Sequence, residues 1–316
     1  MTTAIAIALY NGERFLKEQL DSLRTQTRLA DRVVLCDDCS KDNTFAMVEE
    51  YIRTYSLEDS WKLYKNDPNL GYVKNFYRAV SLCDTDLVFL CDQDDIWAED
   101  KLEKMTAVME TRPEICLLAC QYGIIDAEGN RQHSVVESNE KSDGGIVKVT
   151  VADIMRAYRW PGMIMCLRKS FFREIQEQIQ SCAAAHDLVF CLCAAERNGF
   201  FDYHYVGAYH RRHGNNAARE EHRVSKLLNM DRKLEDIRIT LRLWQNVLES
   251  DIVFSDATKA SVAHRYALLQ KRKEALTERS LSKTLRLYAG NKDGYLRLKS
   301  LICDVWLVCF SGRGKE

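Results

Sequence analysis

Residues 88–97 read Val-Phe-Leu-Cys-Asp-Gln-Asp-Asp-Ile-Trp, an apolar run that ends in three carboxylates within four residues. The run has the continuous apolar character of a strand that is buried on both faces of a parallel sheet. Like charges at the end of such a strand repel one another unless a positive group lies among them. A divalent cation on carboxylate oxygens, with a diphosphate completing its shell, would remove the repulsion. A solvated acidic turn that caps a helix is the alternative.

The 120 residues that start the chain alternate between β-rich runs and amphipathic helical stretches. The β-rich runs are 4–9, 32–36, 61–64 and 86–91. This alternation predicts an α/β fold with a doubly wound parallel sheet. Ligands of such sheets bind beyond the carboxyl ends of the strands, which here selects Tyr10-Asn11, Asp37-Asp38 and residues 92–95.

The second half of the chain has two parts. Residues 115–220 are mixed, with a strand expected at 115–122 and a helix near 187–196. From Ser225 onward the pattern is helical, with an apolar stripe at alternating spacings of three and four. The stripe consists of Leu227, Met230, Leu234, Ile237, Leu241, Trp244 and Leu248. It predicts a helix that packs on its own domain or on a neighbouring helix, and a coiled-coil homodimer is the alternative.

Charge and composition restrict the class of partner. The net charge of −1 gives no bias toward nucleic acid, but residues 271–316 carry eleven Lys or Arg and five Asp or Glu. A basic end on an acidic body favours an anionic surface as partner. No secretory signal is recognisable, and no apolar run reaches the roughly 20 residues of a membrane-spanning helix. We therefore expect a cytoplasmic protein whose twelve cysteines are reduced and pack as small apolar side chains.

Several motifs occur in the order typical of one enzyme family. They are Tyr10-Asn11-Gly12-Glu13, residues 36–44, Asn69-Leu70-Gly71 with Asn75-Phe76, residues 92–97 with Lys101-Leu102, His186-Asp187 and His213-Gly214-Asn215-Asn216. Over residues 1 to about 220 the chain resembles the family-2 inverting glycosyltransferases of GT-A fold. The last three motifs are similar to those of bacterial polysaccharide rhamnosyltransferases. The resemblance implies a Rossmann-like GT-A domain at 1–220, with a nucleotide-sugar half (1–115) and an acceptor half (116–220), and a helical C-terminal region at 221–316.

The resemblance also implies how the donor is held. Asp38 would read the edge of the base, Asp92 would contact the ribose, and Asp94 and His213 would bind Mg²⁺ or Mn²⁺ between the phosphates. Asp95 would support the loop or reach the donor sugar. The implied nucleotide-sugar contacts are Ala8, Tyr10, Asn11, Glu13, Asp37, Asp38, Lys74, Asn75, Asp92, Gln93, Asp95 and Arg211. A capping role for Asp37 and a solvated helix face for Lys74 and Asn75 are the alternatives.

The basic motif at residues 210–216 departs from the family pattern at His210 and Arg212, whereas Arg211 and His213 match it. Guanidinium groups suit the developing charge of a diphosphate leaving group. A basic surface loop is the alternative.

The acceptor side needs a base, because the attacking hydroxyl must lose its proton during inverting transfer. The family has an acid at the start of a helix below the acceptor site, and that position matches Asp187. A simple N-cap is the alternative. His186 would orient Asp187, touch the acceptor or serve the structure. Trp160 and Gly162 would lie at the acceptor site, where an exposed Trp could stack on a sugar, although a buried core Trp is an equal alternative.

The sequence therefore predicts a metal-dependent glycosyltransferase that acts on a polysaccharide or lipid-linked glycan. Its donor would be dTDP-rhamnose, with a UDP-hexose or UDP-N-acetylhexosamine as the alternative. A non-catalytic carbohydrate-binding or scaffold protein is the main competing interpretation. A nucleotidyltransferase would need a Gly-rich basic loop after the initial strand, which Tyr10-Asn11-Gly12-Glu13 is not. We expect the basic and apolar tail to dock on the inner face of the cell membrane or to pack on the C-terminal helices.

Overall fold

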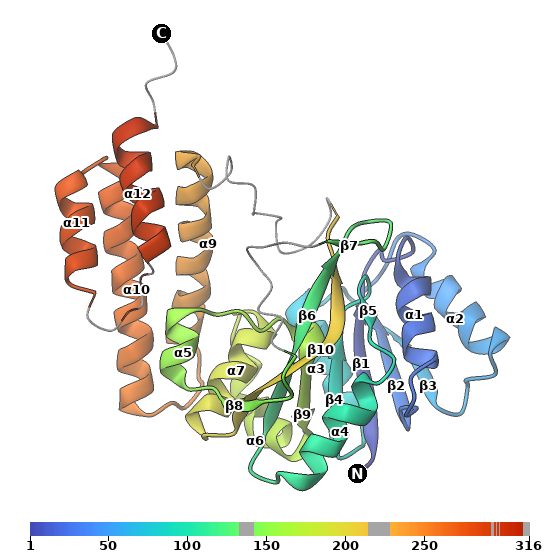
Figure 1. Ribbon diagram of the computed structural model, residues 1–316. Helices are drawn as coiled ribbons and strands as arrows, with labels where there is room; N and C mark the ends of the chain where they lie inside the picture. The colour runs from blue at the N-terminus through green and yellow to red at the C-terminus, as the bar shows by residue number, and fades with distance from the viewer. Residues whose placement is uncertain (133–141, 214–227, 292–293, 295, 297, 312–316) are drawn as a thin grey trace. The chain divides into compact units, whose positions relative to one another are not determined.

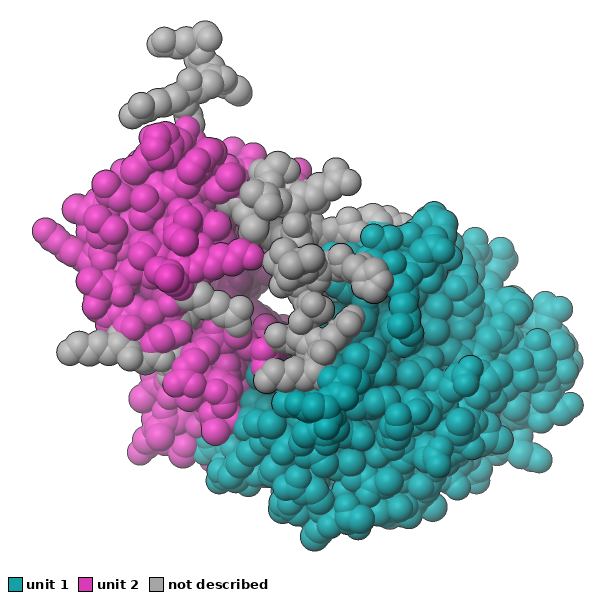
Figure 2. Space-filling model, viewed as in Figure 1, with its two compact units in different colours: residues 1–149, 160–180, 185–214 teal, residues 150–159, 181–184, 215–316 magenta. Residues whose placement is uncertain are grey.

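The computed structural model describes residues 1–132, 142–213, 228–291, 294, 296 and 298–311 (Figure 1). The chain forms two compact units (Figure 2). Unit 1 contains residues 1–149, 160–180 and 185–214, and unit 2 contains 150–159, 181–184 and 215–316. Unit 1 is an α/β domain, whereas the described elements of unit 2 are helices. The expected division of unit 1 into donor and acceptor halves concerns function and stays a prediction.

A mixed β-sheet forms the centre of unit 1. Within the described residues the strand order is β3-β2-β1-β4-β9-β6-β10-β5, with β7 on β6 and β8 on β10. The strands are β1 (Thr3–Leu9), β2 (Arg32–Asp37), β3 (Trp61–Lys65), β4 (Leu87–Cys91), β5 (Ile96–Trp97), β6 (Leu117–Ile125), β7 (Arg131–Gln132), β8 (Ile146–Lys148), β9 (Met165–Arg168) and β10 (Phe200–Arg211). Every residue of β4 is buried, as its uninterrupted apolar sequence predicts.

Helices connect these strands and cover the sheet. They are α1 (Leu16–Arg24), α2 (Thr44–Thr54), α3 (Tyr72–Leu82), α4 (Lys101–Thr111), the short helix η1 (Gly162–Ile164), α6 (Lys169–Ile179) and α7 (His186–Glu196). Helix α1 buries Leu16, Leu20 and Leu23 on the apolar face that the sequence predicts. Helix α3 packs on β1 and β2, so its amino end lies near the carboxyl ends of these strands.

The parallel sheet that the sequence predicts for the start of the chain is confirmed in β3-β2-β1-β4, whereas the later strands, for which no direction was predicted, make the sheet mixed. Strand β9 is antiparallel to both β4 and β6, and β10 is parallel to β6 but antiparallel to β5. The apolar stretch that contains β9 is buried in either direction, so its composition does not encode strand direction. The twelve-residue strand β10 was not predicted, although its aromatic residues are typical of strands.

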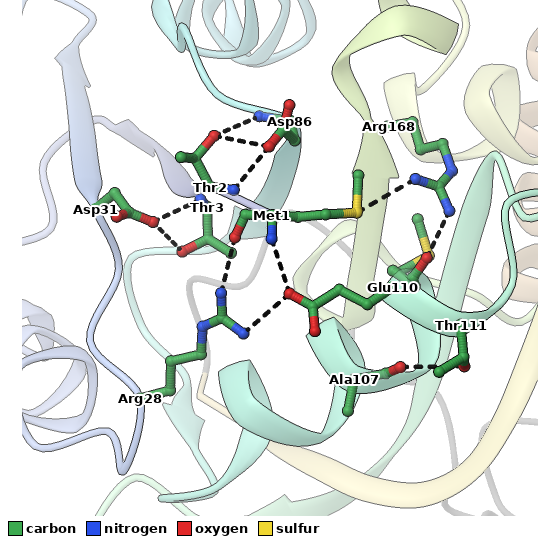
Figure 3. A network of polar contacts seen from close by, with 11 residues as sticks. Met1, Thr2, Thr3, Arg28, Asp31, Asp86, Ala107, Glu110, Thr111 and Arg168 are labelled. Atoms are coloured by element: carbon green, nitrogen blue, oxygen red, sulfur yellow. Dashed lines mark hydrogen bonds and ion pairs between the residues drawn. The ribbon is translucent and has the colours of Figure 1, made fainter.

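The amino ends of the central strands are held by short polar contacts (Figure 3). Thr2 donates to Asp86 Oδ2 from its backbone N (2.8 Å) and its hydroxyl (3.0 Å). Thr3 donates to Asp31 Oδ2 in the same way, at 2.8 and 3.1 Å. Because Asp31 precedes β2 and Asp86 precedes β4, these contacts join three adjacent strands. The loops of the opposite, carboxyl edge carry the candidate site.

The cysteines behave as the sequence predicts. All twelve are free thiols, and most are buried. Burial raises the pKa of the Cys36 thiol to about 12, which opposes formation of a reactive thiolate in the Cys36–Cys39 segment.

Unit 2 contains α5 (Val151–Arg156), α9 (Met230–Leu248), α10 (Asp256–Thr277), α11 (Leu281–Ala289) and α12 (Leu298–Phe310). Helix α9 packs on α10 and buries Ile237, Leu241 and Trp244 of the predicted stripe, while Leu248 is exposed. Leu227 lies outside the described residues. In the described part of the chain, no helix combines the length and the apolar character that crossing a membrane requires.

A buried ion pair joins the last helices of unit 2. The Arg272 guanidinium of α10 donates to both oxygens of Asp304 of α12, from Nε at 2.7 Å and from Nη2 at 2.9 Å. The Tyr288 hydroxyl of α11 donates to Asp304 Oδ2 at 2.9 Å. Since Asp304 is fully buried, it fixes the rotation of α12 about its own axis.

We expect Asp304→Ala to lower the free energy of unfolding by about 3–5 kcal/mol, because it leaves the Arg272 charge buried without its partner. Urea denaturation followed by circular dichroism measures the change. The double variant Arg272→Met/Asp304→Leu should recover most of the loss. Glu274→Ala, which breaks the exposed pair with Lys283, is the matched control and should change the midpoint little. Equal stability of Asp304→Ala and the control would contradict the role of the buried pair.

Candidate functional site

Three loops at the carboxyl edge of the sheet, residues 10–13, 37–44 and 92–95, brace one another. The Gln93 side chain accepts a hydrogen bond from Tyr10 N and donates one to Tyr10 O, both at 2.9 Å. A Cβ at position 12 would collide with Gln93 Oε1, so this close approach requires Gly12. Gln93, expected to contact the donor, therefore uses both ends of its amide to join the ends of β1 and β4.

The loop after β1 is tied to the loop after β2. Asn11 donates from its backbone N to Ser40 Oγ (3.0 Å), and its side-chain oxygen accepts from Lys41 N (2.8 Å). Glu13 Oε2 accepts from Asn43 N at 2.8 Å. Asn11 has a positive φ of 50°, a conformation that asparagine tolerates better than most residues. The structure thus engages the Asn11 and Glu13 side chains in holding the loops together.

Asp38 and Asn75 face the interior. Asp38 Oδ1 accepts from Asn66 Nδ2 and Leu70 N, both at 2.7 Å, and Oδ2 accepts from Gly71 N at 2.8 Å. Asn75 accepts from the same Asn66 amide at 2.8 Å and donates to a carbonyl of β2. Both side chains are buried, which differs from the expectation that they face the donor. Their contacts instead fix the start of α3 against the end of β2.

The remaining residues expected on the donor side differ in their surroundings. Asp37 is fully buried; its Oδ2 accepts from Ser40 N at 3.1 Å, but Oδ1 has no hydrogen-bond partner in the described structure. The Tyr10 ring is exposed at the carboxyl edge, and Ala8 is half-buried at the end of β1. Lys74 is exposed on α3, which agrees with a solvated helix face.

The acidic loop after β4 is paired with residues at the end of β10. Asp94 Oδ2 lies 2.9 Å from His213 Nε2. Asp95 is fully buried; its Oδ1 accepts from Arg211 N (2.9 Å) and lies 3.1 Å from His210 Nδ1, while its Oδ2 has no partner within the described residues. Residues Gly214–Asn216 of the basic motif lie outside the described residues.

The charges in this loop interact strongly. Burial, followed by the charges of Asp95 and Asp94, raises the pKa of Asp92 well above its ordinary value. Burial and the charge of Asp95 also raise the pKa of Asp94, against the opposing effect of His213. Burial would lower the pKa of His210, but its hydrogen bond to Asp95 and the three acidic charges outweigh burial and raise it to about 9. His210 is therefore positively charged at neutral pH, but a single imidazolium does not balance three carboxylates.

The acidic loop and His213 supply some, but not all, of the ligands that a divalent cation needs. Carboxylate oxygens and an imidazole are ligands that Mg²⁺ and Mn²⁺ accept, and a cation would relieve the repulsion that raises the two pKa values. No group of three or more His, Cys, Asp or Glu in the described ranges is arranged to hold a metal by itself. A cation here would therefore need further ligands, such as the phosphates of a bound nucleotide.

Arg211 is fully buried and holds the acidic loop from inside. Its Nε donates to Asp94 O (2.9 Å), Nη1 to Ala127 O (3.0 Å) and Nη2 to Glu18 Oε2 (2.6 Å). The guanidinium also lies over the Phe15 ring, at 4.9 Å from its centroid. This placement differs from the expectation that Arg211 faces a diphosphate, because its donors already serve acceptors of the protein.

The acceptor-side residues meet at the start of α7. Asp187 is half-buried in the initial turn of α7, and its Oδ1 accepts from Leu188 N at 2.8 Å. The buried His186 ring stacks on Phe76 at 4.0 Å, and neither ring nitrogen has a partner in the described structure. A Cβ at Gly162 would lie only 2.6 Å from His186 Nε2. Burial lowers the pKa of His186, which favours a neutral imidazole.

Electrostatics connects Asp187 to the acidic loop. The charge of Asp187 contributes to the raised pKa of Asp92, after burial and the neighbouring acids. Burial and then Asp187 raise the pKa of Tyr72, whose ring lies 6.2 Å from His186. The start of α7, the start of α3 and the end of β4 therefore form one region of unit 1.

Trp160 lies in the buried core of unit 1. It is buried and meets Phe200 edge to face, with 5.2 Å between the ring centroids. The expectation of a Trp exposed at a sugar site is corrected by this burial, which agrees with the core interpretation.

Three residues of the site region were assigned no role from the sequence, although Lys101 belongs to one of the motifs. Lys101 Nζ is buried, donates to Met163 O at 2.6 Å and lies 3.5 Å from the centre of the Trp97 ring. It thereby joins the segment after the acidic loop to η1. Asn66 directly follows β3, so the rule that selects strand ends would have found it. Glu18 lies on the exposed part of α1, and no sequence signal distinguishes it as the partner of Arg211.

Comparisons with known proteins agree with this arrangement. The model of glycosyl transferase family 2 matches residues 4–182. The dTDP-rhamnosyl transferase RfbG of Shigella flexneri is 36% identical over 101 residues, which are 31% of this chain and 34% of that protein. The chain spans less than half the length of the curated relatives it matches.

Two solved structures show the fold. The S. aureus TarS 1–349 complex with UDP-GlcNAc has a TM-score of 0.58 at 18% identity, over 90% of this chain and 76% of that chain. The mannosyltransferase PcManGT of Pyrobaculum calidifontis, in complex with GDP-Man and Mn²⁺, has a TM-score of 0.57 at 13% identity, over 99% and 88%. These likenesses confirm the predicted GT-A fold with a helical C-terminal region.

The contact between Gly162 and His186 is directly testable. Gly162→Ala should displace the stacked imidazole and lower the free energy of unfolding by about 1–3 kcal/mol, the usual effect of overpacking. Gly290→Ala is the matched control, because its Cβ would meet no atom closer than 3.5 Å. Thermal denaturation of both variants checks the difference. If the two variants are equally stable, the close packing of η1 on α7 is wrong.

Proposed function

The chain belongs to glycosyl transferase family 2, and from this premise we propose that it is a metal-dependent, inverting glycosyltransferase. The observation that carries the proposal is the crowding of Asp92, Asp94 and Asp95 at the end of β4, with His213 beside Asp94 and Asp187 within electrostatic range. Acids that raise one another's pKa are suited to a cationic ligand rather than to a solvated turn.

On the donor side, Asp94 and His213 would hold Mg²⁺ or Mn²⁺, with Asp92 close by. The metal would supply positive charge to the diphosphate as the bond to the sugar breaks. The exposed Tyr10 ring can lie against the base or the ribose, whereas the buried Asp37 would support the loop from within. Arg211 would act indirectly, by fixing the backbone of the loop that carries Asp94.

On the acceptor side, Asp187 would be the general base. Its Oδ1 is held by Leu188 N, whereas no partner of Oδ2 is found within the described residues. Oδ2 would take the proton of the acceptor hydroxyl while that oxygen attacks the anomeric carbon from the face opposite the diphosphate. The bond between the anomeric carbon and the diphosphate oxygen would break in the same displacement, so that the nucleotide diphosphate leaves and the configuration inverts. The neutral, stacked His186 would hold the start of α7 in place.

We also propose which classes of donor and acceptor the enzyme uses. The relative from Shigella flexneri favours dTDP-rhamnose, while the complexes of TarS and PcManGT make UDP-N-acetylhexosamines and GDP-sugars necessary comparisons. The acceptor would be a cell-surface polysaccharide or a lipid-linked glycan. We place the protein at the cytoplasmic face of the membrane as a peripheral protein, with a homodimer as the competing use of its C-terminal region.

The decisive experiment is a donor screen. Pure protein is incubated with Mn²⁺ and a panel of dTDP-, UDP- and GDP-sugars, and the slow release of nucleotide diphosphate is measured. We expect release from one class of donor. Binding of a donor or glycan without any release would favour the non-catalytic interpretation.

Asp94→Asn should lower donor turnover at least about 10²-fold, since a metal's stabilisation of transition-state charge is worth several kcal/mol. Asp84→Asn is the matched control, because Asp84 is an exposed acid that precedes β4 at the opposite edge of the sheet. Nucleotide release in the presence of Mn²⁺ measures both variants. Equal rates for Asp94→Asn and wild type would show that the metal site is assigned wrongly.

Asp187→Asn should retain donor binding and lose turnover by roughly 10²–10⁴-fold, the contribution of a general base. Calorimetry with the intact nucleotide-sugar measures binding, and transfer to an acceptor measures turnover. A near-normal kcat in this variant would leave Asp187 with only its capping contact to Leu188.

A further inference from the structure

Helix α12 exposes its largest apolar side chains. Leu298, Ile302, Trp306 and Phe310 follow one another at intervals of four residues and are 71%, 63%, 39% and 54% exposed. Residues at this spacing lie along one side of a helix. We call these four residues the α12 stripe. A row of large apolar groups in water is unusual on a small helical unit and indicates an interaction surface.

The outward direction of the α12 stripe is fixed by the opposite face of the same helix. Asp304, Leu307 and Val308 are buried, and Asp304 forms the bidentate pair with Arg272. Rotating α12 to bury the stripe would move the Asp304 carboxylate into solvent and leave Arg272 buried without its partner, at high cost. The helix therefore places its acid inside and its large apolar groups outside.

The charges near the α12 stripe indicate what covers it. Asp304 is neutralised inside, and the other charged residue of α12 is the exposed Lys299. The preceding helix α11 adds the exposed Arg286, whereas its exposed Lys283 is paired with Glu274 and Glu278. By sequence, residues 279–316 carry eight Lys or Arg and three Asp or Glu. An apolar stripe with basic flanks and a Trp is complementary to the headgroup and upper acyl region of an anionic lipid bilayer.

We infer that the α12 stripe is a lipid-docking surface, which inserts into the interface of an anionic membrane without crossing it. Helix α12 has only 13 residues, which suits insertion in the membrane plane. The inference rests on the proposed function in one respect, since a lipid-linked acceptor would be presented at such a surface. Lipid binding itself needs no donor, so it can be tested when catalysis is absent.

Trp306 supplies a specific optical probe. The other four tryptophans, Trp61, Trp97, Trp160 and Trp244, are buried, whereas Trp306 is exposed. Full-length protein is mixed with phosphatidylcholine vesicles that contain or lack phosphatidylglycerol, with brominated acyl chains as quencher. We expect fluorescence quenching only with the anionic vesicles, and its loss in Trp306→Phe. Quenching that persists in Trp306→Phe would overturn the assignment of this face.

Flotation tests the apolar contribution independently. The variant Leu298→Gln/Ile302→Gln should bind anionic vesicles at least about tenfold less than wild type, because two aliphatic groups that would enter the membrane are lost. The variant Leu29→Gln/Val253→Gln is the matched control; these residues are 65% and 70% exposed outside α12 and should not affect flotation. Both variants should keep the wild-type melting temperature.

Two flotation results would also overturn the inference. One is equal flotation of the stripe variant and wild type. The other is a wild-type dimer that does not float and becomes monomeric in the stripe variant, which would make α12 a contact between two copies of the chain. Donor turnover without vesicles is measured in parallel. Its failure with normal flotation would contradict the proposed enzyme but not the docking surface, and the reverse result would contradict only the docking surface.

Discussion

The repulsion among three carboxylates at the end of a buried strand is the constraint on which the site depends. Asp92, Asp94 and Asp95 follow β4, the strand in which every residue is buried, so water cannot screen their charges well. Groups at the end of β10 contact these acids. The backbone N–H of Arg211 and the imidazole of His210 contact Asp95, and the imidazole of His213 contacts Asp94. These contacts stabilise the loop but do not neutralise it, because the pKa values of Asp92 and Asp94 remain raised. A ligand that brings positive charge is therefore favoured at this place.

The architecture explains how distant parts of the sequence reach that loop. Strand β4 lies between β1 and β9, so the loops after β1 and β2 are its neighbours at one edge of the sheet. Gln93 and Arg211 fix the acidic loop from two sides, by the backbone of Tyr10 and by Glu18. Lys101 extends the connection to η1, which packs on His186 beside Asp187. The candidate base and the candidate metal ligands are thus held by one continuous set of contacts within unit 1.

The sequence predicted which loops form the site better than it predicted what each side chain does there. Strand ends are recognisable because apolar runs stop at them, and this rule located Asp37 and the acidic loop. It could not tell that Asp38 and Arg211 point inward, because only the tertiary structure brings together the donors that contact Asp38 and the acceptors that contact Arg211. The antiparallel direction of β9 could not be predicted for a similar reason, because burial on both faces looks the same in parallel and antiparallel neighbours. The inward direction of Asp304 depended on Arg272, 32 residues away, which no local pattern indicates.

The central claim is that the acidic loop accepts a cation together with a nucleotide diphosphate. Thermodynamic linkage makes this measurable, because two ligands that favour each other do so by the same factor in both directions. Calorimetry of wild-type protein with dTDP or UDP, in Mn²⁺ and in a chelator, gives the first factor, and titration of Mn²⁺ with and without the nucleotide gives the second. The account predicts that each ligand tightens the binding of the other by an equal, large factor. Nucleotide binding of the same affinity in Mn²⁺ and in the chelator would contradict it.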